Sequence, residues 1–309
     1  MWLSSRRMIL WSETKRGSKG RRNKYALAGL LLQPVAGLTV AALVSSAAAT
    51  ECNQSGGEPH AIIRAADATV MVLDDGREVR LAGLIAPPPP VAVPMAGATW
   101  APEQAARAAL ANLAATARAD VLIEPSSRDR HGRPAAQVYI TTRDGARIWL
   151  QRALVEQGLA IVSARNGGAL ACQEILLAAE ETARRTSTGV WANPVYRTHK
   201  ASDVFALMRL RSSFALVEGT VVSVTTRAGR LFLNFGSDWK TDFTAAVPQV
   251  LLKAAPGAAA TLQALEGHTV RVRGWIERRY GPSIEISGLA DIEDLNPRAI
   301  APSPPVPTP

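Results

Sequence analysis

Residues 214–288 contain a series of short segments in which β-branched and other apolar residues alternate with polar ones. Five segments are typical of strands, and a helical stretch near 248–265 separates the third strand from the fourth. The strand segments are 214–226, 230–235, 240–246, 268–279 and 283–288. Three strands, a helix and two strands form a small barrel, so this pattern argues for a separate β-rich unit in the second half of the chain.

This order of elements is that of the OB-fold, whose members often bind oligonucleotides. We therefore predict an OB-like domain at 211–295, joined to what precedes it by a linker at 196–210. Residues 296–309 are rich in proline and predict a disordered tail.

The first half of the chain mixes strands with helices. Strands are predicted at 60–73, 78–85, 119–124 and 135–141, and helices at 102–116, 148–157 and 171–185. These elements define a domain at 50–195. The predicted fold class is mainly β with α (α+β), with one barrel in each half.

The N-terminal segment differs from the rest of the chain in its charge. Residues 1–24 contain eight basic residues and one acidic residue, whereas 25–49 are uncharged and mostly apolar. The formal net charge is +9, but from Thr50 onward 27 basic residues face 25 acidic ones. Residues 1–49 thus predict a signal peptide, or a membrane anchor, and a protein that is periplasmic, secreted or held in the inner membrane facing the periplasm.

The chain has two cysteines, Cys52 and Cys172. In an oxidising compartment such a pair is expected to form a disulfide that ties the start of the mature chain to the first domain. Two isolated cysteines make no metal cluster, and the four histidines show no ligand spacing, which argues against a zinc site. The histidines are His60, His131, His199 and His268.

Four motifs occur in the order and spacing of a known family. They are Val79-Arg80-Leu81-Ala82-Gly83-Leu84, Asp129-Arg130-His131-Gly132-Arg133, Leu154-Val155-Glu156-Gln157-Gly158-Leu159-Ala160 and Gly189-Val190-Trp191. Over about residues 60–195 the chain resembles the thermonuclease (staphylococcal nuclease-like) family. The resemblance implies a five-stranded OB-type barrel that carries three helices.

The resemblance also implies a chemistry. The family hydrolyses phosphodiesters of DNA and RNA with one calcium ion, held by carboxylates, and uses two arginines to neutralise the phosphate in the transition state. Those phosphate-binding arginines match Arg80 and Arg133, which are both present.

The family's carboxylates are missing at the matching positions. Ile85 stands where a metal-ligand aspartate is expected, and Pro88 where the general-base glutamate is expected. The third acid falls on Thr69 or on Ala68, depending on how the turn is aligned, and leaves Asp67 as the nearby acid. Loss of a base alone costs on the order of 10²–10⁴ in rate. We therefore expect no cofactor, with Ca²⁺ relevant only if the chain is an active nuclease.

Two groups of residues are candidates for binding nucleic acid. Arg130 lies in the basic turn beside Arg133, and Arg271, Arg273 and Trp275 share one face of a predicted strand. A tryptophan among arginines is suited to hold a single strand by stacking and charge. Further aromatic residues extend this set or form barrel core: Phe232, Phe235, Trp239 and Phe243.

Three functions remain open from the sequence. The first is an exported, catalytically depleted nuclease-fold protein that binds nucleic acid, weakly and as a single strand, or binds other proteins. The second is an active metal-dependent nuclease with a rearranged acidic set drawn from Asp67, Glu103 and Asp129. The third is a structural protein of the cell envelope that contacts envelope proteins.

Overall fold

The computed structural model describes residues 52, 57–91, 100–114 and 118–296. The predicted signal or anchor segment at 1–49 and the tail beyond residue 296 lie outside these ranges. Within them, no helix combines the length and the hydropathy that crossing a membrane requires.

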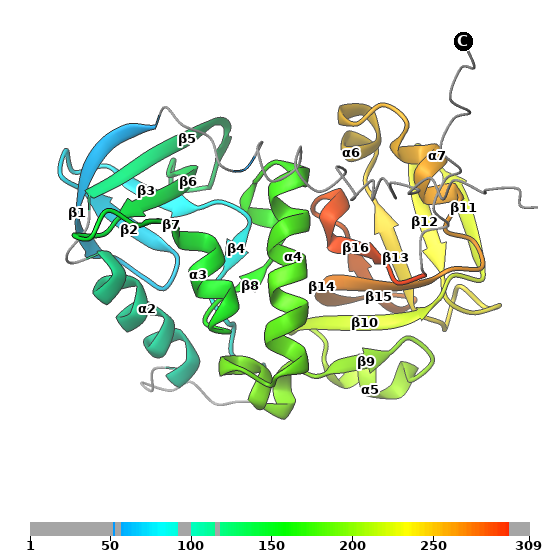
Figure 1. The fold of residues 1–309 in the computed structure, drawn as a ribbon. Helices are drawn as coiled ribbons and strands as arrows, with labels where there is room; N and C mark the ends of the chain where they lie inside the picture. The colour runs from blue at the N-terminus through cyan, green and yellow to red at the C-terminus, as the bar shows by residue number, and fades with distance from the viewer. Residues whose placement is uncertain (1–51, 53–56, 92–99, 115–117, 297–309) are drawn as a thin grey trace, which may run out of the picture. The chain divides into compact units, whose positions relative to one another are not determined.

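Five strands of the first half form a closed barrel (Figure 1). They are β1 (Glu58–Ala65), β2 (Val70–Leu73), β3 (Glu78–Leu81), β5 (Arg118–Arg128) and β6 (Pro134–Thr141). The antiparallel path β3–β2–β1–β5–β6 is closed by a parallel pairing of β3 with β6. This ring confirms the predicted OB-type barrel. A short strand, β7 (Arg147–Trp149), extends the sheet beside β6.

The three expected helices pack around this barrel. They are α2 (Ala101–Ala114), α3 (Leu150–Glu156) and α4 (Leu170–Arg185). Leu110, Leu154 and Leu176, one from each helix, are fully buried and join the strand residues in one apolar core. Outside the five-stranded ring, β4 (Leu84–Ile85) pairs with β8 (Ile161–Val162). This pairing brings the chain after β3 next to the chain before α4.

The strands of the second half follow the same path. They are β10 (Phe214–Thr220), β11 (Ser223–Arg227), β12 (Arg230–Asn234), β13 (Thr244–Val247), β14 (Thr269–Arg279) and β15 (Gly281–Glu285). The order is β11–β12–β13–β15–β14–β10, with β13 and β15 parallel. Because β10 and β11 are consecutive parts of one stretch of chain, the path returns to its start, as in the first barrel.

Two short helices, α6 (Gln249–Ala254) and α7 (Ala258–Gln263), lie between β13 and β14, in the stretch expected to be helical. A last strand that the sequence pattern did not indicate, β16 (Ile292–Asp294), pairs with β14.

Several predicted strands are interrupted. Residues 60–73 form two strands rather than one, because Ala66 and Asp67 both donate their N–H groups to the Val70 carbonyl and reverse the chain. The segment 78–85 is divided at Gly83, whose φ of +76° places it in the left-handed region. Local turn chemistry therefore divides what the alternation of residues joins.

The predicted linker at 196–210 is wrong in one respect, because this segment is folded. It contains β9 (Thr198–Lys200), which pairs in parallel with β10, and α5 (Val204–Arg209). Ala201 and Leu207 are buried in the core of the second sheet. This segment is therefore part of the second folded unit.

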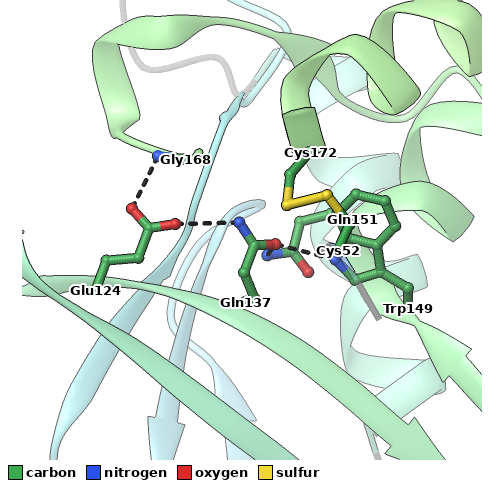
Figure 2. The surroundings of a disulfide bond; sticks show 7 residues. All are labelled: Cys52, Glu124, Gln137, Trp149, Gln151, Gly168 and Cys172. Atoms are coloured by element: carbon green, nitrogen blue, oxygen red, sulfur yellow. Dashed lines mark hydrogen bonds between the residues drawn. A yellow bond between two sulfur atoms is a disulfide. The ribbon is translucent and has the colours of Figure 1, made fainter. Parts of the chain in front are cut away.

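Cys52 and Cys172 form a disulfide that ties the chain before β1 to the first turn of α4 (Figure 2). Beside it runs a chain of polar contacts. Glu124 accepts hydrogen bonds from the Gly168 backbone N–H and from the Gln137 amide, at 2.8 and 3.1 Å. The Gln137 carbonyl in turn accepts from Trp149 and Gln151, each at 3.0 Å. These bonds fix β5, β6 and the loop before α4 to one another.

Candidate functional site

A cavity of about 960 Å³ with a highly charged lining lies where the first barrel meets β14 of the second. We call it the arginine cavity, because seven arginines line it: Arg80, Arg128, Arg130, Arg133, Arg165, Arg211 and Arg278. Its acidic residues are Asp67, Asp129 and Glu277, and Thr69, Asn166 and Trp275 also contribute. The excess of cations favours the binding of an anion there.

Arg80 lies on β3 with its side chain only 8% exposed. Its guanidinium donates to the side-chain carbonyl of Asn166, and its Nε, 3.9 Å from the Asp129 carboxylate, has no hydrogen-bond partner. Burial lowers the pKa of Arg80, while the negative charge of Asp129 counteracts that effect. A buried guanidinium with an unused donor is suited to bind an oxyanion.

Arg133 and Asp129 belong to the turn between β5 and β6. The Asp129 carboxylate accepts the backbone N–H groups of His131 and Arg133 at 2.8 and 3.0 Å, and the Arg133 Nε at 2.8 Å. Desolvation raises the pKa of Asp129, but these hydrogen bonds outweigh it and bring the pKa to about 2. Asp129 is thus a permanent anion that braces the turn, which leaves it unsuited to act as a general base near neutral pH.

The remaining five arginines of the cavity differ from Arg80 and Arg133 in their partners. Across the part of the chain that the structure describes, none of these five forms an ion pair with a carboxylate; they are Arg128, Arg130, Arg165, Arg211 and Arg278. All five are exposed. The Arg165 guanidinium lies over the ring of Trp275, 4.8 Å from its centroid. The Trp275 ring also packs edge to face with the ring of Phe214. Trp275 is therefore both a half-buried packing residue and part of the cavity wall.

Arg271 and Arg273 were predicted to bind nucleic acid, and the structure places them elsewhere. Arg273 is fully buried and donates to the Glu180 carboxylate and the Val162 carbonyl, at 2.8 and 3.0 Å. Arg271 is held by Glu181 and Glu218 at 2.9 and 2.6 Å. Both arginines also pair with Glu293. Both guanidinium groups are held by carboxylates within the protein and neither lines the arginine cavity, so this part of the prediction is wrong.

These ion pairs join α4 of the first half to β14 of the second. Figure 1 shows α4 running between the first barrel and the strands β10 and β14. Burial alone lowers the pKa of Arg273, but the two carboxylates reverse the effect and raise it, so the charge is held permanently. A buried charge with several fixed partners gives the contact between the barrels a defined geometry.

The comparison with protein families covers the chain from β3 of the first barrel to the residues that follow α4. Residues 78–193 match the family model described as Staphylococcal nuclease homologue. The chain contains a staphylococcal nuclease homologue domain. No curated protein matches the chain.

Ile85 and Pro88, two positions where the family resemblance predicts carboxylates, lie outside the arginine cavity. Ile85 is 8% exposed and belongs to a cluster with Ile161 from its own domain and with Phe214 and Leu216 from β10. The Pro88 carbonyl accepts a hydrogen bond from the Tyr196 hydroxyl at 3.0 Å. The second barrel packs on the place where the family resemblance puts a metal ligand.

The third acid position is resolved in part by geometry. Asp67 and Thr69 line the arginine cavity, whereas Ala68 is fully buried and does not. The Asp67 carboxylate accepts the backbone N–H of Thr69 at 2.7 Å, which closes the turn between β1 and β2. Asp67 therefore faces the cavity but has a structural task there.

The residues present do not fit a calcium ion. Ca²⁺ binds six to eight oxygens, with several carboxylates among them. Among the residues described, Asp67, Asp129 and Glu277 line the cavity but do not converge as a ligand group, and Glu103 of α2 lies outside it. Within the described ranges, the side chains that lie close enough together to ligate a metal ion are those of His60, Asp74 and Asp75. Arg77 contacts both His60 and Asp75 there.

Two members of the cavity, Arg165 and Arg211, were not predicted. Arg165 follows β8 and Arg211 follows α5, so they are far from each other and from the Arg130 turn in sequence. No local motif marks them. They become part of one site only because β14 and the folded segment before β10 pack beside the nuclease homologue domain.

Proposed function

We propose that the chain binds nucleic acid through the arginine cavity and does not cleave it. The observation that carries this proposal is the set of arginines in one cavity, most of them without a carboxylate partner in the described part of the chain. Guanidinium groups match the oxygens of phosphodiesters in geometry and charge. The membership of residues 78–193 in a nuclease family favours a nucleic-acid backbone over other anions.

The same observations support catalytic depletion. Phosphodiester hydrolysis in this family needs carboxylates for the metal ion and for the water. Ile85 and Pro88 offer neither, and the carboxylates of Asp67 and Asp129 are engaged in turns. Of the groups that this chemistry needs, the phosphate-binding arginines Arg80 and Arg133 are present, and both line the arginine cavity.

We also propose that the protein works outside the cytoplasm, in the periplasm or beyond it. The basic and then apolar character of residues 1–49 favours export. The disulfide between Cys52 and Cys172 supports an oxidising compartment.

Binding is expected to be weak, independent of sequence and sensitive to salt. About three or four phosphate contacts to a single strand predict a slope of log K against log salt of roughly −2 to −3. Replacing two cavity arginines, Arg130→Gln with Arg278→Gln, is expected to weaken binding and reduce that slope by about 1.4. Fluorescence anisotropy with a labelled 20-nucleotide strand across a salt series measures both.

The control for this experiment keeps the net charge equal. Arg152 and Arg185 are arginines outside the arginine cavity, so Arg152→Gln with Arg185→Gln removes the same charge elsewhere. We expect this control to bind almost as the wild type does. Equal losses in both double variants would show a general charge effect and contradict the proposed site. A wild type that binds no oligonucleotide at low salt would overturn the function itself.

We expect no calcium-stimulated phosphodiesterase activity above background. Combining Ile85→Asp with Pro88→Glu is not expected to restore it, because residue 85 points into the apolar cluster and not into the cavity. An aspartate buried there without partners is expected to cost several kcal/mol of stability. Nuclease assays with Ca²⁺ or EDTA, combined with thermal unfolding of the variant, test both statements. Cleavage by the wild type that EDTA and Arg80→Ala both abolish would contradict the statement on activity.

A further inference from the structure

A second cavity, of about 630 Å³, opens on the sheet of the second barrel and has a different lining. We call it the aromatic cavity, because Phe232, Trp239 and Tyr280 line it together with hydroxyl and amide side chains and three arginines. It involves β11, β12 and β13 and the turns that follow β12 and β14. The proposed binding of phosphates at the arginine cavity does not account for it.

The aromatic residues of this cavity are unusually exposed. Trp239 is 45% and Tyr280 is 70% exposed, although large apolar side chains are normally buried. Their rings meet edge to face with centroids 5.0 Å apart, so each orients the other. The two rings thus form a small platform at the surface with a fixed arrangement.

The backbone keeps Tyr280 in this position at a cost. Its φ of +70° lies in the left-handed region, which a bulky side chain rarely adopts. Tyr280 forms the tip of the β14–β15 hairpin, between the paired residues Arg279 and Gly281. A side chain at 281 would collide with the Thr241 carbonyl, since a Cβ there would lie 2.4 Å from that oxygen. Strain that projects an aromatic ring into solvent is a feature of binding sites.

The charge of the aromatic cavity is positive. Arg227, Arg230 and Arg279 line it, and no acidic residue in the described ranges does. Glu285, outside the lining, holds the guanidinium groups of Arg230 and Arg279 at 2.7 and 2.6 Å. Arg227 is exposed. Cations around exposed aromatic rings suit a ligand that carries both flat rings and negative charge.

The aromatic cavity and the arginine cavity each share lining residues with a third cavity. This third cavity, of about 460 Å³, shares Arg165, Trp275 and Glu277 with the arginine cavity and Arg279 with the aromatic cavity. Trp275, Glu277 and Arg279 alternate along β14 and therefore lie on one face of it, over about 13 Å. One side of a single strand of the sheet connects the two sites.

We propose that the aromatic cavity is a base-stacking site, which holds unpaired bases of the same strand whose backbone the arginine cavity binds. This inference rests on the proposed function. It makes the ligand single-stranded nucleic acid, because bases in a duplex are stacked on each other and cannot lie on Trp239 or Tyr280. The surrounding arginines, and the third cavity that shares lining residues with both sites, favour this ligand over an uncharged sugar polymer.

The test compares variants of the full chain on four ligands: a single strand, a duplex, an abasic strand of the same length and an uncharged oligosaccharide. Trp239→Ala is expected to weaken binding of the single strand about 5- to 150-fold, the effect of losing one stacked base. Trp239→Phe is expected to retain most of the affinity. Phe205, 76% exposed on α5 and outside both cavities, provides the matched control Phe205→Ala, which is expected to have no effect.

The abasic strand separates stacking from loss of structure. The affinity of the wild type for the abasic strand is expected to be as low as the affinity of Trp239→Ala for the complete strand. On the abasic strand itself, Trp239→Ala and the wild type are expected to have the same affinity. The duplex is expected to be insensitive to Trp239→Ala. Equal losses on the complete and abasic strands would overturn the inference, as would oligosaccharide binding that Trp239→Ala abolishes.

The failure of this inference is distinguishable from that of the proposed function. If Trp239→Ala binds the single strand as the wild type does while Arg130→Gln with Arg278→Gln still weakens binding, the stacking site is wrong and the phosphate site stands. If the wild type binds no nucleic acid, both are wrong. Thermal unfolding of Trp239→Ala and Trp239→Phe verifies that the variants compared are folded.

Discussion

Replacing Arg273 with methionine is expected to lower the free energy of unfolding by about 3–5 kcal/mol, the typical cost of removing one partner from a buried ion pair. Arg273 and Glu180 are both fully buried and face each other across the contact between α4 and β14. Without Arg273, the Glu180 carboxylate keeps the backbone N–H of Val162, at 2.7 Å, as its described partner. Chemical denaturation of the full chain measures the loss.

Two comparisons make this prediction specific. Glu180→Leu combined with Arg273→Met removes the stranded charge and is expected to recover part of the lost stability. Arg152→Met breaks a pair with Glu156 in which the arginine side chain is 56% exposed, and is expected to change stability by no more than about 0.5 kcal/mol. An Arg273→Met protein as stable as Arg152→Met would contradict the structural role assigned to the pair.

Removing the disulfide is expected to lower the free energy of unfolding by about 2–4 kcal/mol. The cross-link joins residues that are 120 positions apart, so it restricts the unfolded chain over a long loop. Cys172→Ser, Cys52→Ser and the double variant are expected to lose the same amount. Denaturation in the presence and absence of a reductant measures the effect in the wild type.

The double variant also serves as the control for the reductant. Because it has no disulfide left, its stability is expected to be independent of the reductant, while that of the wild type falls to the same value. A wild type that is equally stable in both conditions, with two alkylatable cysteines before reduction, would show that the cross-link does not form in solution.

The order of strands was predictable from the sequence, whereas their limits were not. Alternation of apolar and polar residues identified both barrels, because each strand has one face in a core. It joined β1 to β2 because the residues between them are themselves buried: Ala68 and Thr69 are 0% and 6% exposed. The reversal at this point depends on a side-chain cap by Asp67, which alternation does not register.

The residues of the candidate site that lie within short sequence motifs were predictable. Arg80, Arg130 and Arg133 come from motifs within the nuclease homologue domain and meet in one cavity. The assignment of Arg271 and Arg273 failed for a physical reason. Alternation correctly placed them on one face of β14 with Trp275, but it does not show that α4 packs on the first part of this face and leaves the last part open.

The packing of Ile85 against Phe214 and Leu216 has a consequence for which substitutions the chain tolerates. Residue 85 packs against the neighbouring barrel, so a mutation to aspartate is expected to destabilise the fold by burying a carboxylate among apolar side chains. Because the three side chains belong to one cluster, the effects of substitutions at 85, 214 and 216 on stability are expected to be non-additive.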